Sequence, residues 1–345
     1  MQKIEKLLQK RAAELLAEGT VERVLAWQAG EFFYDNAPAA VGSADECDKL
    51  VYNEFCPANL CKYLIETSHA GKKTAVFLKP CDTYGVNQLL KDNRIKRELV
   101  YAIGTPCSGM LDINKIKAAG AKGIISVSVD GDEVVVNTAY GEKRLAKADV
   151  LLNKCLMCKG AAYKIADEEL AEPLTVPQFT GDKFAKVKEI EAMSAEERFA
   201  FWQSELSKCI RCNACRDICP ACSCEQCVFD KPDTPVAGKA YADEVEEQMY
   251  HIIRAFHVAG RCTGCGECAK VCPTGAISFV ERECARVCPQ GIHLELLNMK
   301  FMKDINSFFG QYQAGADSET PAPQVSYKQN DPEANSAVEG REQHV

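Results

Sequence analysis

The first half of the chain, from about residue 22 to residue 149, alternates short apolar runs with stretches of helical periodicity. Residues 74–80 (TAVFLKP) and 99–106 (LVYAIGTP) have the continuous apolar character of buried strands, and residues 83–95 between them have helical spacing. A strand, a helix and a second strand in this order form a βαβ unit. We therefore expect the two strands to be parallel neighbours in one sheet.

A β-hairpin and two further helices are predicted beyond this unit. Residues 123–141 have strand-like runs on either side of an Asp-Gly-Asp turn, which is typical of a hairpin. Residues 194–208 begin with a capping box formed by Ser194 and Glu197 and then present an apolar face at helical spacing. Residues 242–260 predict a second helix that ends at a glycine.

These elements divide the chain into segments of different character. We expect an α/β Rossmann-like domain over residues 1–170 and a mostly α-helical domain over residues 194–309, joined by a linker over residues 171–193. Residues 310–345 are rich in Ser, Pro, Ala, Gln and Glu and contain almost no large apolar side chains. Because such a segment has little apolar surface to bury, we predict a disordered tail.

Length, charge and cysteine content narrow the class of protein. A chain of 345 residues can bury a sizeable core, and its formal net charge of -8 argues against a nucleic-acid or anionic-membrane surface, so neither partner is expected. The chain has 20 cysteines, yet residues 1–16 carry charges throughout and lack the apolar core of a signal peptide. No apolar run approaches the ~20 residues that span a bilayer. We therefore expect the thiols to be metal ligands in a reducing cytoplasm.

Two cysteine runs in the second half have the spacing of a 4Fe-4S ferredoxin motif. Each follows the pattern C-x2-C-x2-C-x3-C-P, in which three thiolates bind one cluster and the fourth reaches the other cluster of a two-cluster ferredoxin. The first run consists of Cys209, Cys212, Cys215 and Cys219, and the second of Cys262, Cys265, Cys268 and Cys272. Structural zinc is the alternative, but zinc sites usually show separated CxxC pairs. By the crossed rule, Cys272 completes the cluster of the first run and Cys219 completes that of the second.

The second run has two candidate ends. The sequence CAKVCPTG at residues 268–275 recurs as CARVCPQG at residues 284–291. Either Cys272 or Cys288 can therefore close the cluster. We favour Cys272, because its shorter loop costs less entropy to close, and Cys284 and Cys288 are then spare thiols. The spacing assigns no role to three further thiols, Cys222, Cys224 and Cys227.

A third group of cysteines is predicted in the first half. Cys81 and Cys107 each follow a proline at the end of one of the two parallel strands, so both are expected at the carboxyl edge of the sheet, where open α/β sheets place their sites. A CxxC pair after the hairpin supplies two more thiols, Cys155 and Cys158. Together the four can hold a third 4Fe-4S cluster, with amides near Asp82 donating to its sulfurs. A zinc site and buried, redox-active thiols are the alternatives.

Five segments carry a resemblance to a known family. They are residues 77–90 (FLKPCDTYGVNQLL), 103–112 (IGTPCSGMLD), 153–160 (NKCLMCKG), 201–227 (FWQSELSKCIRCNACRDICPACSCEQC) and 259–268 (AGRCTGCGEC). Over roughly residues 50–309 the sequence resembles iron–sulfur proteins related to the beta subunits of deazaflavin-linked hydrogenases and formate dehydrogenases. The resemblance implies an electron carrier that works beside formate dehydrogenase, hydrogenase or heterodisulfide-reductase-like subunits in anaerobes.

The combined expectation is an α/β Rossmann-like domain with one cluster, followed by a mostly α-helical two-cluster ferredoxin domain, in a non-catalytic electron-transfer subunit. No acid–base pair or nucleophile is required, because the clusters supply the chemistry. Some beta subunits bind a flavin, so the alternative is a flavin-dependent oxidoreductase subunit that passes electrons from a reduced coenzyme to its clusters. No Gly-rich dinucleotide motif follows a strand, so we assign no flavin-binding residue. A zinc-stapled interaction module is a third class.

Overall fold

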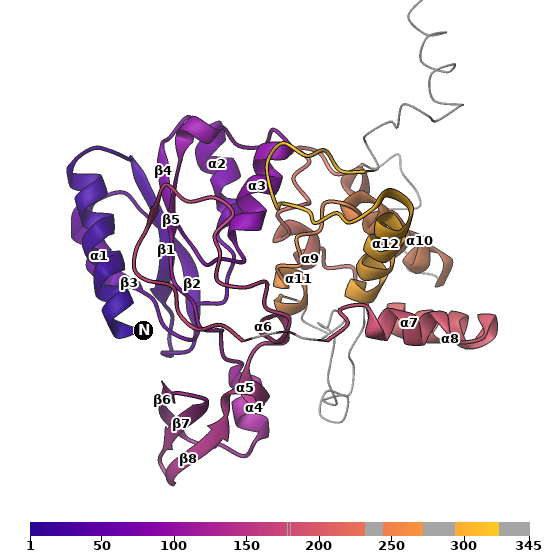
Figure 1. Cartoon of the computed structure of the whole chain (residues 1–345), viewed down its shortest axis with the longest axis horizontal. Coiled ribbons are helices and arrows are strands. Elements are labelled where there is room, and N and C mark those ends of the chain that lie inside the picture. The colour runs from indigo at the N-terminus through magenta and orange to yellow at the C-terminus, as the bar shows by residue number, and fades with distance from the viewer. Residues whose placement is uncertain (178, 180, 232–243, 272–293, 324–345) are drawn as a thin grey trace, which may run out of the picture.

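The structure is a computed structural model that describes residues 1–177, 179, 181–231, 244–271 and 294–323. Figure 1 shows two bodies side by side, which we call the α/β half and the helical half, with a small sheet projecting from the first. None of the described helices is long and apolar enough to cross a membrane.

The α/β half is built around a six-stranded mixed sheet. Its strands are β1 (Arg23–Ala29), β2 (Asn36–Val41), β3 (Leu50–Val51), β4 (Thr74–Leu78), β5 (Val100–Gly104) and β9 (Glu168–Glu169). β1, β4, β5 and β9 are parallel neighbours in this order, while β2 and β3 pair antiparallel with β1. Helix α3 (Thr83–Lys91) connects β4 to β5, so the predicted βαβ unit is confirmed. The finer Rossmann-like assignment stays a prediction.

Helices cover both faces of this sheet (Figure 1). The buried residues Leu8, Ala12 and Leu15 of α1 (Gln2–Ala17) recur every three or four positions, and this stripe packs in the core of the sheet. Helices α2 (Leu64–His69) and α3 lie on the other side. β4 is buried at every position because it has a strand on each side and helices on each face, which explains its continuously apolar sequence.

A separate antiparallel sheet follows in the chain. The predicted hairpin is confirmed: β6 (Ile124–Asp130) pairs with β7 (Glu133–Thr138), and Gly131 in the turn has a φ of +59°. A third strand, β8 (Gly141–Ala146), extends the sheet and was not predicted, because its side chains are largely exposed and polar. Short helical segments complete this half: η1 (Ala44–Lys49), η2 (Cys61–Tyr63), η3 (Arg97–Leu99), α4 (Ile113–Ala118), α5 (Lys147–Val150) and α6 (Asn153–Leu156).

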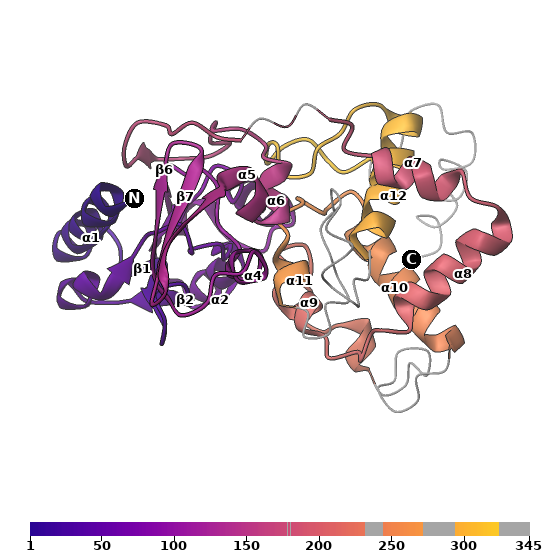
Figure 2. The same ribbon diagram turned by 90° about the horizontal axis from the view of Figure 1, so that it is seen from below.

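The second body is helical, as predicted. Its elements are α7 (Ala185–Glu191), α8 (Ala195–Leu206), α9 (Ala214–Asp217), η4 (Val228–Asp230), α10 (Glu244–Val258), α11 (Glu267–Lys270) and α12 (Leu294–Phe309). The predicted capping box is present: Glu197 N–H donates to the Ser194 hydroxyl, and Ser194 N–H donates to the Glu197 carboxylate. Figure 2 shows α9 and α11 on the side of this body that faces the sheet.

Helix α7 lies within the segment that we expected to be a linker. Its Val187 and Ile190, spaced one helical turn apart, pack with Met299 of α12. Glu191, the last residue of α7, forms ion pairs with Lys300 and Lys303 of α12. Part of the expected linker is therefore attached to the helical half.

Residues 310–323, which we expected to be disordered, lie against α3. Asn87 donates a hydrogen bond to the Gly315 carbonyl at 3.2 Å, and the Lys91 ammonium lies 5.4 Å from the centre of the Tyr312 ring. The expectation of disorder does not hold for these residues, because small and polar groups can order a segment through backbone contacts without a large apolar core. Residues 324–345 lie outside the described part of the chain.

We expect Gly315→Ala to detach this segment from α3. A Cβ at Gly315 would collide with the carbonyl oxygen of Tyr84, and the residue has a φ of +73°, whereas at Gly310, with a φ of +89°, a Cβ would meet nothing. Both substitutions carry the strain of the left-handed conformation, but only the first adds a clash. Gly315→Ala should therefore cost about 1–3 kcal/mol of unfolding free energy more than Gly310→Ala. Equal stabilities in anaerobic thermal unfolding would show that the contact is unimportant.

Candidate metal centre

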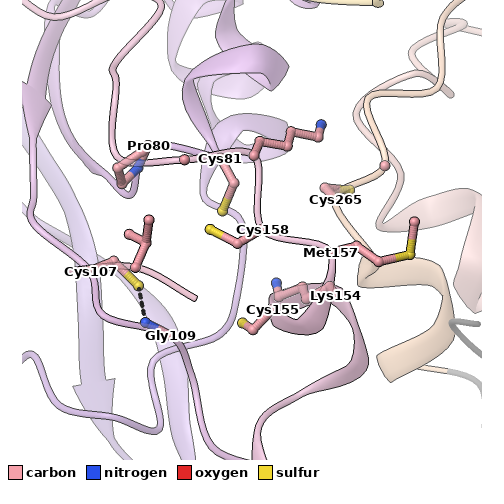
Figure 3. A pocket seen from close by; sticks show the side chains of 13 residues that line it. Pro80, Cys81, Cys107, Gly109, Lys154, Cys155, Met157, Cys158 and Cys265 are labelled. Atoms are coloured by element: carbon pink, nitrogen blue, oxygen red, sulfur yellow. Dashed lines mark hydrogen bonds between the residues drawn. The ribbon is translucent and has the colours of Figure 1, made fainter. Parts of the chain in front are cut away.

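Four cysteines line one pocket at the carboxyl edge of the six-stranded sheet, which we call the sheet pocket. Cys81 follows β4, Cys107 follows β5, Cys155 lies on α6 and Cys158 lies just after α6. Figure 3 shows the four side chains arranged around the same space. The structure thus brings together the four thiols that the sequence singled out from segments far apart in the chain.

Backbone amides support two of these sulfurs. Gly109 N–H donates to Cys107 Sγ and Met110 N–H donates to Cys155 Sγ, each at 3.3 Å. Gly109 has a φ of +103°, a conformation that favours glycine. Hydrogen bonds of this kind stabilise a thiolate and orient it as a ligand. The loop after β5 therefore supplies the donors that we had expected from the start of α3.

Burial raises the pKa of three of these thiols, to about 12 for Cys107 and above the ordinary value for Cys81 and Cys155. Without a bound cation, burial therefore favours the neutral form of these three thiols. Metal ligation requires thiolates, which the positive charge of bound iron or zinc would stabilise. Four thiols with amide donors behind two of them are a donor set that fits an iron–sulfur cluster.

The four thiols lie around the sheet pocket and do not gather at one position. The sheet pocket is partly open to solvent. Among the described residues, no three His, Cys, Asp or Glu side chains converge on the position of a single ion. A zinc ion needs sulfurs about 2.3 Å from one centre. A cubane cluster is bulkier and places each thiolate on a different iron atom.

A buried ion pair holds the backbone on either side of Cys81. Lys79 Nζ lies 2.6 Å from the Asp82 carboxylate, and both side chains are 1% exposed. Lys79 also donates to the Ala58 carbonyl at 2.9 Å and lies 4.4 Å from the centre of the Trp27 ring. Burial opposes its charge, but Asp82 outweighs this effect and raises the pKa of Lys79. Sequence reasoning missed this pair, although two charged residues flanking Pro-Cys at the end of an apolar strand were a usable signal.

The two cysteine runs of the helical half have the same backbone conformation. Arg211 and Asn213 in the first run have φ values of +49° and +64°, and Gly264 and Gly266 at the equivalent positions of the second have +62° and +72°. Positive φ is unfavourable for residues other than glycine, so its presence at Arg211 and Asn213 indicates a required turn. Such turns direct peptide N–H groups toward one side and form a nest for an anion. Arg211 N–H indeed donates to Cys209 Sγ at 3.3 Å.

Arg254 of α10 is a buried cation between the two runs. Its side chain is 4% exposed, and its Nη2 donates to the Cys215 carbonyl at 3.1 Å. Burial opposes its charge, but the thiols of Cys215, Cys268 and Cys219 raise the pKa of Arg254 above its ordinary value. Its Nε has no hydrogen-bond partner among the described residues. A buried N–H without an acceptor is costly, and cluster sulfides would supply one here.

The fourth cysteine of the first run lies beside the second run. Burial, Glu267 and Cys219 together raise the pKa of Cys265, which places Cys219 within electrostatic range of that thiol. This placement is compatible with the crossed assignment of Cys219. Sequence spacing assigned no role to Cys222, yet its hydrogen bond to Cys219 lowers the pKa of Cys219 to about 6. Three cysteines of the closing segments, Cys272, Cys284 and Cys288, lie outside the described residues.

The second cysteine run forms part of the wall of the sheet pocket. Gly264 and Cys265 line this pocket together with the four cysteines of the α/β half. Figure 3 shows Cys265 on the far side of the pocket from Cys107. Close to this wall, Lys154 of α6 pairs with Glu267 of α11 at 3.1 Å. The two candidate cofactor sites are thus neighbours.

Comparisons with known proteins found a family and several relatives. A family described as a 4Fe-4S binding domain matches residues 256–278. The F420-dependent formate dehydrogenase subunit beta of Methanocaldococcus jannaschii is 26% identical over 317 residues, which cover 75% of this chain and 82% of that protein. The F420-dependent formate dehydrogenase 1 subunit beta of Methanococcus maripaludis is 24% identical over 307 residues, which cover 71% and 78%, respectively.

This chain was also matched to a chain of one solved structure. It is a chain of the F420-reducing nickel–iron hydrogenase complex from Methanosarcina barkeri, with 15% sequence identity and a TM-score of 0.39. The match covers 48% of this chain and 65% of that chain.

Proposed function

We propose that this chain, an iron–sulfur protein related to the beta subunits of F420-dependent formate dehydrogenases, is an electron-transfer subunit. It would relay single electrons through 4Fe-4S clusters between a formate dehydrogenase or hydrogenase and a heterodisulfide-reductase-like partner. One observation carries this proposal: Cys265 of the second cysteine run lines the sheet pocket, so the candidate sites of the two halves adjoin. Adjacent sites can form a path for electrons through the protein.

We assign the ligands of three clusters as follows. The sheet pocket holds one cluster with Cys81, Cys107, Cys155 and Cys158. The other two have crossed ligands: Cys209, Cys212 and Cys215 with Cys272, and Cys262, Cys265 and Cys268 with Cys219. The contact between the α9 and α11 segments and the proximity of Cys219 to Cys265 support this crossing. The matched 4Fe-4S domain supports Cys272, because residues 256–278 include it and end before Cys284.

The clusters supply reversible one-electron chemistry, and the chain's own residues hold them and set their surroundings. Cysteine thiolates ligate, the amides of Gly109 and Met110 donate to sulfur, and Arg254 places a buried positive charge between the two runs. The left-handed residues of each run orient further N–H groups toward the ligands. None of these roles requires a nucleophile or an acid–base pair.

The alternative function is a flavin-dependent oxidoreductase subunit. The names of the two curated relatives favour it, because both are called F420-dependent, and a protein that reacts with such a coenzyme must convert a hydride into single electrons. In this case the α/β half would bind a flavin close to the sheet pocket.

Protein purified without oxygen is expected to contain about twelve irons per chain and to show the broad visible absorption of 4Fe-4S clusters without flavin bands. Dithionite should bleach this absorption reversibly, and the reduced protein should return electrons to a one-electron acceptor. The measurements are iron and sulfide analysis with anaerobic optical spectroscopy. A flavin spectrum would favour the alternative, and colourless protein with bound zinc would contradict both functions.

A further inference from the structure

Three lysines of the α/β half reach across to the two cysteine runs of the helical half. Each donates to, or pairs with, a group of the helical half. The contacts run from Lys62 to the carbonyl of Cys219 at 3.3 Å, from Lys154 to the carboxylate of Glu267 at 3.1 Å, and from Lys159 to the carbonyl of Thr263. We call these three side chains the bridging lysines.

The groups that they contact lie next to the proposed ligands of a single cluster. Cys219 is itself a proposed ligand, Thr263 directly follows Cys262, and Glu267 directly precedes Cys268. The bridging lysines therefore come close to this cluster site from three separate positions in the α/β half, and Lys154 and Lys159 also line the sheet pocket.

The surroundings make their charges effective. Lys154 is 10% exposed and Glu267 is 3% exposed, and Lys62 and Lys159 are also partly buried. Water screens charges poorly in such places, so an ammonium group acts strongly on a charge nearby. Glu267 offsets part of the charge of Lys154, whereas Lys62 and Lys159 donate to carbonyl oxygens. Burial lowers the pKa of both of these ammonium groups.

We propose that the bridging lysines are positioning residues that raise the reduction potential of the cluster held by Cys219, Cys262, Cys265 and Cys268. This inference rests on the proposed function. Reduction of a 4Fe-4S cluster adds one electron without making or breaking a bond, so the cluster becomes more negative and a nearby cation favours the reduced form. The middle cluster would then be the place where electrons collect between the sheet pocket and the first cysteine run.

A purely structural role for these lysines predicts a different result. If they only join the two halves, their removal should lower stability and leave the cluster potentials unchanged. If they act through charge, replacement by arginine should preserve the potential, and replacement by methionine, which is similar in length but neutral, should lower it.

The test is an anaerobic redox titration of the full chain with dithionite and mediators, followed by electron paramagnetic resonance. Three variants are Lys62→Met, Lys159→Met and the combination of the two. A fourth joins Lys154→Met with Glu267→Gln, so that the positive and the negative charge of this ion pair are removed together and the net charge stays the same. We expect the combined Lys62 and Lys159 variant to lower the reduction equilibrium constant of one cluster about tenfold, or about 59 mV for a one-electron couple. The potential of the cluster in the sheet pocket, which Lys159 also lines, should fall as well, and that of the cluster held by Cys209, Cys212 and Cys215 should change least.

Lys10→Met is the matched control. Lys10 is a largely exposed residue of α1, which lies on the side of the molecule away from the helical half (Figure 1). Lys10→Met removes one positive charge, as Lys62→Met and Lys159→Met each do, so its cluster potentials should equal those of the wild type. A shift as large as that of either single variant would overturn the proposal, because it would be a general effect of net charge.

Iron content separates this inference from the proposed function. If the wild type lacks clusters, the proposed function fails. If the wild type and the methionine variants hold the same iron but all potentials stay equal, only the role of the lysines is refuted. Should the combined variant lose iron, the single variants Lys62→Met and Lys159→Met decide: a lowered potential in either supports the action of charge, and unchanged potentials in both contradict it.

Discussion

Replacement of any one cysteine of the sheet pocket by serine is expected to remove about four of about twelve irons per chain. The variants are Cys81→Ser, Cys107→Ser, Cys155→Ser and Cys158→Ser, and iron and sulfide analysis measures the result. The four thiols line one pocket and are half-buried, and a neutral serine hydroxyl cannot replace a thiolate ligand there. The spectrum of the two clusters in the helical half should persist, and electron transfer through the whole protein should fail.

Cys47→Ser is the matched control for these variants. Cys47 is a thiol of the α/β half that is 2% exposed, and its contact is the Ser43 carbonyl at 3.6 Å rather than the sheet pocket. Its replacement should leave the iron content unchanged. If all four pocket variants also keep wild-type iron and sulfide, the third cluster does not exist. The pocket would then be better interpreted as a docking or flavin-binding surface.

Cys272→Ser is expected to have the second large effect. Loss of the fourth ligand should convert the cluster of Cys209, Cys212 and Cys215 to a three-iron form or release it, because three thiolates can still hold three irons. Cys288→Ser should retain the full iron content, since its loop to the second run is longer and costs more entropy to close. Iron analysis and electron paramagnetic resonance of the oxidised protein distinguish a three-iron from a four-iron cluster.

Two results would change this assignment. If Cys288→Ser loses iron and Cys272→Ser does not, Cys288 is the closing ligand and residues 269–284 form an inserted loop. If both single variants keep their iron, the two cysteines substitute for one another, and the double variant should then lose about four irons.

Local sequence patterns predicted much of the secondary structure. The βαβ unit, the β6–β7 hairpin, the capping box at Ser194 and the helix α10 were all visible, because periodicity, turn residues and caps act over a few neighbouring positions. The strand β8, the helix α7 and the ordered residues 310–323 were missed. Each has few large apolar side chains, so tertiary contacts rather than local preference decide its conformation.

The sequence by itself determined the two ferredoxin-type runs, because cysteine spacing fixes how thiolates wrap a cluster within a short length of chain. It also placed Cys81 and Cys107 at one edge of the sheet, since parallel neighbouring strands end together. Only the tertiary structure decided that Cys265 lines the sheet pocket. It likewise decided that Lys154 and Lys159 reach the second run and that Lys62 reaches Cys219, the last cysteine of the first run. These contacts join residues far apart in sequence, so they depend on how the two halves pack, which local spacing does not specify.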